Sequence, residues 1–141
     1  MRLLLDTHIF LWFISADAQL PAAWRDSIRD PRNDVFLSVV SVWEAMVKYA
    51  IGKLPLPHPP EDYLPTQRVQ HQMTSLPLDE ASVRRLATLP SVHRDPFDRM
   101  LVCQALAHGL TVVTVDPVFR AYPAPLLDRT SYETAGQGGL E

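Results

Sequence analysis

The sequence predicts an α/β fold in which a central parallel sheet of four to five strands carries helices on both faces. Short apolar runs alternate along the chain with longer segments whose apolar residues recur at helical spacing. Strands that alternate with helices form parallel sheets covered on both sides, and such strands are apolar throughout. The length of 141 residues, with 47% hydrophobic and 21% charged residues, suits one globular domain with its own core.

The first half of the chain contains two predicted strands and three predicted helices. "RLLLD" is an apolar run ending in an acid, which is typical of a buried strand, whereas "HIFLWFIS" is long and bulky enough for a helix packed on the sheet. "LPAAWRDSIRD" has apolar residues at every fourth position and a proline near its start, and "DPRND" is a turn. The elements expected here are a strand over 2–6, helices over 8–15 and 20–30, a strand over 35–38 and a helix over 41–52 that ends at Gly52.

The second half begins with the proline-rich stretch 53–65, for which we expect a loop. It leads into a helix over about 60–72, kinked or split at Pro65. The remaining expected elements are a strand over 74–78, an amphipathic helix over 79–89 capped by Asp79, a helix over 95–109 closed by Gly109 and a strand over 110–116. We expect the domain to span 1–133 and residues 134–141 to form a flexible glycine-rich tail.

Composition excludes several classes of protein. The formal charge of −3 does not indicate a nucleic-acid partner, although arginine, with 11 of the 13 basic residues, is the side chain suited to phosphate contacts. Cys103 is the only cysteine, so an internal disulfide is excluded. Asp6 and His8 interrupt the apolar start, which argues against a signal peptide, and no run approaches the length of a membrane span. We therefore expect a cytoplasmic protein.

Acidic residues recur at equivalent places in the predicted fold. Asp6 and Asp116 end two of the predicted strands, and ligands of open parallel sheets bind outside the carboxyl ends of the strands. Glu44 and Asp98 lie in the first turns of predicted helices. All four acids could therefore converge on one edge of the sheet.

Each of these acids also has a purely structural explanation. An Asp after a strand often caps a helix or starts a turn, and Ser41 with Glu44 forms the S-x-x-E capping-box pattern. In "DPFDR", Asp95 fits the N-cap and Pro96 the first helical position. We expect Asp98 to cap the helix and to bind a ligand at the same time, because an acid is favoured near the positive end of the helix dipole.

A converged acidic cluster would need protons or cations. Two carboxylates about 4 Å apart repel by roughly 4 kcal/mol at an effective dielectric of 20, and several such pairs would rival the stability of a domain. Hard oxygen ligands favour Mg²⁺ or Mn²⁺, and such ions activate water and stabilise the leaving oxygen in phosphodiester hydrolysis. Arg94, Arg99 and Arg120 lie near the acids in sequence and could bind the flanking phosphates of a nucleic acid.

The sequence resembles a PIN domain, and specifically the VapC-type toxins of bacterial toxin–antitoxin pairs. The resemblance rests on three blocks in the correct order, "LLLDTHIFLWF", "LSVVSVWEAMVKYAIGKL" and "HRDPFDRMLVCQALAHGLTVVTVDPVF". It implies a single PIN-like domain acting as a Mg²⁺- or Mn²⁺-dependent endoribonuclease on single-stranded or looped RNA, including tRNA. The positions that match the metal-binding acids of the family are Asp6, Glu44, Asp98 and Asp116.

The resemblance also implies supporting groups and partners. Thr7 and Thr114 match positions whose hydroxyls support the acidic cluster, and Asp95 remains an N-cap or an outer residue of the site. The family implies a homodimer and an antitoxin protein that occludes the site. Two alternatives stay open, an inactive PIN-like scaffold and a phosphatase of the haloacid-dehalogenase type; the phosphatase usually has a second Asp where this chain has His8.

Overall fold

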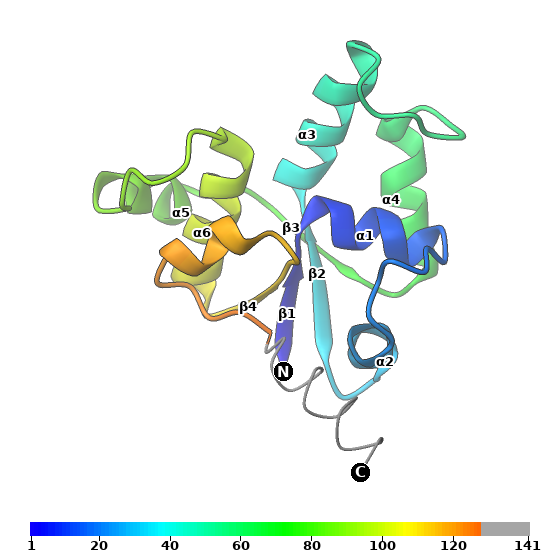
Figure 1. Ribbon diagram of the computed structural model, residues 1–141, viewed down its shortest axis with the longest axis horizontal. Coiled ribbons are helices and arrows are strands. Elements are labelled where there is room, and N and C mark those ends of the chain that lie inside the picture. Colours follow the sequence, from blue (N-terminus) through cyan, green and yellow to red (C-terminus); the bar gives the residue numbers. More distant parts are fainter. Residues whose placement is uncertain (128–141) are drawn as a thin grey trace.

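The computed structural model describes residues 1–127, which form a four-stranded parallel sheet with helices on both faces. The order of the strands is β3-β2-β1-β4 (Figure 1). The elements are β1 (Arg2–Leu5), α1 (Thr7–Ile14), α2 (Ala22–Arg29), β2 (Asp34–Ser38), α3 (Val39–Ala50), α4 (Pro60–Gln70), β3 (Thr74–Leu76), α5 (Glu80–Arg84), η1 (Arg85–Ala87), α6 (Pro96–His108), β4 (Thr111–Val113) and η2 (Pro117–Ala121). The predicted α/β class is confirmed, while the tail at 134–141 lies outside the described residues.

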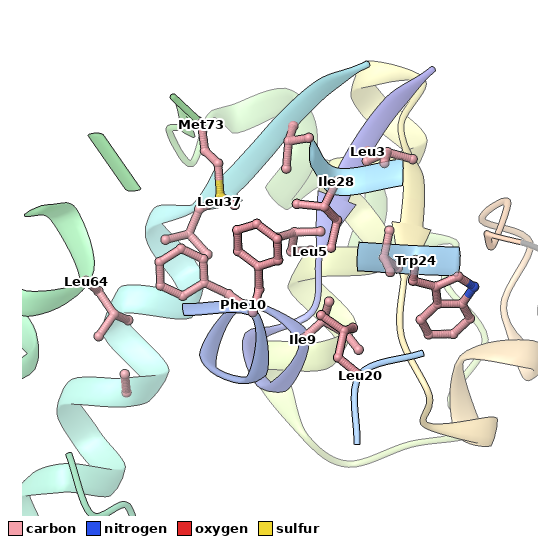
Figure 2. Close-up of a cluster of buried hydrophobic side chains, with 14 residues drawn as sticks. Leu3, Leu5, Ile9, Phe10, Leu20, Trp24, Ile28, Leu37, Leu64 and Met73 are labelled. Atoms are coloured by element: carbon pink, nitrogen blue, oxygen red, sulfur yellow. The ribbon is translucent and has the colours of Figure 1, made fainter. Parts of the chain in front are cut away.

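Both faces of the sheet are buried, as the apolar strand sequences predict. Leu3 and Leu5 of β1 point to the face covered by α1, α2 and α4, and Leu4 points to the opposite face, which α6 covers (Figure 1). Figure 2 shows the first of these cores, in which Phe10 of α1 and Trp24 of α2 pack towards the strands. Alternate residues of one strand therefore anchor β1 from both sides, which fixes where its carboxyl end lies.

Helix ends follow the predicted signals in several places. Gly109 ends α6 with φ of 65°, a left-handed conformation that glycine adopts without steric cost. The side chain of Asp79 caps α5 by accepting from the backbone N–H of Ser82 at 2.9 Å. α4 runs without a break through Pro65, so of the two alternatives predicted there, a kink or a split, the split is wrong. The proline removes only one backbone donor from the helix.

Two element boundaries differ from the predictions in ways that matter for the acids. α3 begins at Val39, directly after β2, because the hydroxyl of Ser38 accepts from the N–H of Val40 at 2.9 Å. β4 ends at Val113, three residues before Asp116. A parallel bridge between Val112 and Leu126 is the remaining contribution to the sheet within 1–127. Over the same residues, no helix combines the length and the apolar character needed to cross a bilayer.

Candidate metal centre

A pocket of about 360 Å³ opens at the edge of the sheet where β1 and β4 end. The chain leaves β1 towards β2 and returns on the other side at β4, so this is the point where the strand order reverses. Residues of α1, α3 and the beginning of α6 complete the lining of the pocket. Five acids line it, namely Asp6, Glu44, Asp95, Asp98 and Asp116.

Asp6 occupies the N-cap position of α1 but its side chain does not cap the helix. Instead, its Oδ2 accepts a hydrogen bond from Thr114 Oγ1 at 2.8 Å, while its backbone N–H donates to Val113 O at 3.0 Å. The carboxylate is therefore turned across the end of the sheet towards β4. A capping hydrogen bond would contribute about 1 kcal/mol to the stability of the helix, and the Asp6 side chain does not make it.

The environment of Asp6 disfavours its charge. Burial raises the pKa of the Asp6 carboxyl above its ordinary value of 3.8, and the neighbouring charge of Glu44 raises it further. The hydrogen bond from Thr114 and the proximity of His8 act in the opposite direction without cancelling the shift. An added cation at this position would favour the ionised form.

Glu44 lies in the second turn of α3, so the predicted capping box is wrong. Because Ser38 caps the helix, Ser41 falls inside it and is buried. Thr7 Oγ1 lies 2.9 Å from Ser41 Oγ and donates to Glu44 Oε1 at 2.7 Å. The hydroxyl of Thr7, on α1, therefore orients the buried carboxylate of Glu44, and Ser41 contacts that same hydroxyl.

Lys48 is a part of this site that the sequence analysis missed. Its Nζ forms an ion pair with Glu44 Oε2, one helical turn away on α3, and it lines the same pocket. Partial burial lowers the pKa of Lys48, but the hydrogen bond and charge of Glu44 outweigh that effect and raise it. The signal was present in the sequence, because Glu and Lys four residues apart meet on one face of a helix.

Asp95 and Asp98 divide two roles at the start of α6. Asp95 Oδ1 accepts from the backbone N–H of Phe97 at 2.8 Å and of Asp98 at 3.3 Å, so Asp95 is the cap. The prediction that Asp98 also caps is wrong. Its carboxylate is free of the backbone, and Oδ2 lies 3.0 Å from His93 Nε2.

The pKa of the Asp98 carboxyl lies far above its ordinary value of 3.8. Burial, followed by the charges of Asp6, Asp95 and Glu44, raises the pKa of the Asp98 carboxyl to about 7. These charges act on one another because Asp6, after β1, and the acids of α3 and α6 line the same pocket. Within 1–127, one group of three ligand atoms lies within 4.8 Å of one another, from His93, Asp95 and Asp98.

Asp116 has a position in the pocket and a structural role as well. Its Oδ1 accepts from the N–H of Val118 at 3.0 Å and caps η2, as the alternative explanation from the sequence proposed. Thr114 links it to the rest of the cluster, because the hydroxyl that donates to Asp6 also accepts from the backbone N–H of Asp116 at 3.1 Å. β4 ends early because the chain turns here.

The predicted phosphate contacts are not brought into this pocket. Arg94 and Arg120 are exposed, and neither lines it. Arg99 Nη1 donates to the carbonyl of Pro90 at 2.7 Å and lies 3.4 Å from the hydroxyl of Tyr122. The positive charge nearest the acids therefore comes from α3.

The donor set fits a hard divalent cation. The lining offers carboxylate oxygens from separate elements, and burial together with neighbouring carboxylates raises the pKa values of Asp6 and Asp98. Oxygen ligands of this kind select Mg²⁺ or Mn²⁺ over softer metals. A bound ion of this class would reduce the repulsion and could take part in hydrolytic chemistry.

Comparisons with known proteins identify the family and the fold. The PIN domain family matches residues 3–125. Ribonuclease VapC16 of Mycobacterium tuberculosis is 35% identical over 74 residues, which cover 51% of this chain and 52% of that protein. The chain thus spans about half the length of the curated relative that it matches.

Solved structures share the fold over most of the chain. The crystal structure of VapBC2 from Rickettsia felis, bound to a DNA fragment from its promoter, has a TM-score of 0.68 at 16% identity, covering 91% of this chain and 98% of that chain. VapBC-5 from Mycobacterium tuberculosis, a member of a family of toxin-antitoxin systems, has a TM-score of 0.51 at 26% identity, covering 85% and 89%.

The pKa of Asp98 predicts how stability depends on pH in metal-free buffer. A folded-state pKa of about 7, above the ordinary 3.8, means that the stabilisation by the protonated carboxyl is complete below about pH 4 and is lost as pH rises through 7. Asp98→Asn stays neutral, so its melting temperature in EDTA should fall less between pH 5 and pH 8. At pH 8 we expect it to exceed that of the unaltered protein by ~3–6 °C, corresponding to about 1–2 kcal/mol.

Asp26→Asn serves as the matched control, because Asp26 is exposed on α2 and lies outside the pocket. It should keep the pH profile of the unaltered protein. If Asp98→Asn has the same profile as this control, the carboxylates do not repel one another as described.

Proposed function

This chain belongs to the PIN domain family, and we propose that it is a metal-dependent endoribonuclease of the VapC toxin type. One observation carries the proposal: Asp6, Glu44 and Asp98 line one pocket, and none of their side chains caps a helix. All three acids are buried, and buried carboxylates are costly unless a positive group compensates their charge. The ion pair with Lys48 compensates Glu44, and a bound cation would compensate the others. The likeness to a protein named as a ribonuclease supports the substrate class.

We assign the metal-holding role to Asp6, Glu44, Asp98 and Asp116. Mg²⁺ or Mn²⁺, when bound, supplies an activated water and neutralises charge on the phosphate. Thr114 fixes the Asp6 carboxylate and Thr7 fixes that of Glu44, so these oxygens stay in place without an ion. Asp95 holds the start of α6 and thereby leaves the Asp98 carboxylate available.

We also propose that an antitoxin protein binds beside the site. A groove of about 340 Å³ shares His8 and Trp12 with the acidic pocket. Leu11 and Ile14 of α1 form part of it, with the proline-rich segment 54–57 opposite. A protein segment in this groove would lie at the entrance to the acids. The toxin–antitoxin complexes among the similar structures support this partner.

The homodimer remains part of the proposal. Trp43, Met46 and Val47 of α3 are more exposed than large apolar side chains usually are, at 53%, 43% and 40%. Trp43 also packs edge to face on Phe97 of α6, with ring centroids 4.8 Å apart. Apolar side chains clustered on one surface helix favour contact with another protein chain.

Replacing Asp6 tests the proposed nuclease activity directly. Asp6→Asn should lower cleavage of a single-stranded RNA in Mn²⁺ by at least ~100-fold, because an interaction that stabilises the transition state is removed. EDTA should abolish cleavage by the unaltered protein. Cleavage rates are measured on purified protein, and circular dichroism checks that the fold persists.

Asp26→Asn removes the same carboxylate from an exposed position of α2 and should leave the rate unchanged. Intact RNA in the presence of the unaltered protein and Mn²⁺ would contradict the proposal and favour the inactive scaffold.

Asp116→Ser separates the two roles of that residue. Serine keeps an oxygen that accepts from the N–H of Val118, so η2 should retain its cap and the melting temperature should change by less than ~3 °C. If the carboxylate holds a metal, cleavage should nevertheless fall at least ~10-fold, with a higher Mn²⁺ requirement. Full activity of the serine variant would restrict Asp116 to capping.

A further inference from the structure

The acidic pocket contains one permanently positive side chain, that of Lys48. Among the described residues that line it, Lys48 is the only lysine or arginine. Its side chain is 34% exposed, whereas the side chain of its partner Glu44 is 3% exposed. The ammonium group thus sits over a buried carboxylate, with part of its surface open to the pocket.

The ion pair holds the lysine in a defined place. Glu44 uses its two oxygens for different partners, since Oε1 accepts from Thr7 and Oε2 contacts Lys48 Nζ. The charges of Asp95 and Asp98 also act favourably on Lys48. A lysine on the surface would lose much conformational entropy on binding a ligand, but this one is already restrained.

The ammonium group has capacity beyond this ion pair. It has three N–H donors, and Glu44 Oε2 is the hydrogen-bond acceptor found for it within 1–127. Five acids line the same pocket, so an RNA phosphate entering it meets repulsion that a positive group must offset. The three arginines predicted for phosphate binding lie outside the lining.

We propose that Lys48 Nζ binds a non-bridging oxygen of the RNA phosphate next to the acids while it remains paired with Glu44. The inference rests on the proposed nuclease function and adds a phosphate-binding residue to it. Lysine binds phosphate as a point charge and needs no fixed orientation, which suits a group tethered at one acid. A narrower role, in which Lys48 only neutralises Glu44, makes different predictions.

Lys53→Met provides a matched control. Lys48 and Lys53 are the two lysines of the chain, and Lys53 is exposed just after α3 and outside the pocket. Both substitutions remove one positive charge from the same region of the protein. A difference in activity between the two variants therefore reflects the position of the lysine and not the net charge of the protein.

The experiment measures kcat and KM for a single-stranded RNA in saturating Mn²⁺ at several salt concentrations. We expect Lys48→Met to lower kcat/KM by ~10–100-fold, mainly through KM, and to reduce the slope of log(kcat/KM) against log salt by ~0.7, the value for one phosphate contact on a single strand. Lys48→Arg should recover most of the loss. Lys53→Met should stay within ~3-fold of the unaltered protein.

The outcomes are separable. If the unaltered protein cleaves RNA and Lys48→Met matches Lys53→Met, the inference is wrong and the nuclease proposal stands. A loss with an unchanged salt slope and a shifted Mn²⁺ requirement also overturns it in favour of simple neutralisation of Glu44. If the unaltered protein does not cleave RNA, the nuclease proposal fails and this inference fails with it. If Lys48→Met does not fold, the same measurements are made on Lys48→Gln and Lys53→Gln.

Discussion

Repulsion between carboxylates at the carboxyl edge of the sheet is the constraint around which the rest of the site is arranged. Asp6 follows β1, while Glu44 and Asp98 lie on α3 and α6. Burial, followed by the charges of Asp6, Asp95 and Glu44, raises the pKa of Asp98 to about 7. Such groups would move apart if their backbones were free to move. The buried leucines of β1 and the core beneath α6 prevent this, because displacing either would expose apolar surface.

Hydrogen bonds from the surrounding polar groups keep the acids in place. Thr114 holds Asp6, Thr7 holds Glu44, and Asp95 takes the capping role that Asp98 would otherwise have. Each of these bonds leaves at least one carboxylate oxygen without a backbone partner. The carboxylates are therefore held in place before any ligand binds, as the proposed metal site requires.

The sequence predicted the fold well where one local signal dominated. The apolar run before Asp6 and the Asp-Pro start of α6 each have a single physical explanation, and the structure has both elements. The start of α3 was missed because Ser38 and Ser41 both offer a capping hydroxyl, and the choice depends on where β2 ends. The extent of β4 was overestimated because the turn at Thr114 is set by its contacts with Asp6 and Asp116, which are remote from each other in sequence.

The convergence of the four acids on one pocket was predictable from the sequence, and the nearby lysine was not. The four acids follow from strand ends and helix starts, and the structure brings them to one pocket, although Asp116 also caps η2. Lys48 carries a sequence signal, its spacing from Glu44, but that pattern is common on exposed helices and gains meaning only when Glu44 is buried. Arg99 is engaged by the carbonyl of Pro90, a contact between segments that spacing does not reveal.

The most direct test of the central claim is a crystal structure of the protein grown with Mn²⁺, with anomalous scattering used to locate the ion. We expect a peak in the acidic pocket, with the ion bonded to oxygens of Asp6 and Asp98 at about 2.0–2.2 Å, a distance close to that of Mg²⁺. A fully occupied ion elsewhere, or a pocket that stays empty at saturating Mn²⁺, would contradict it.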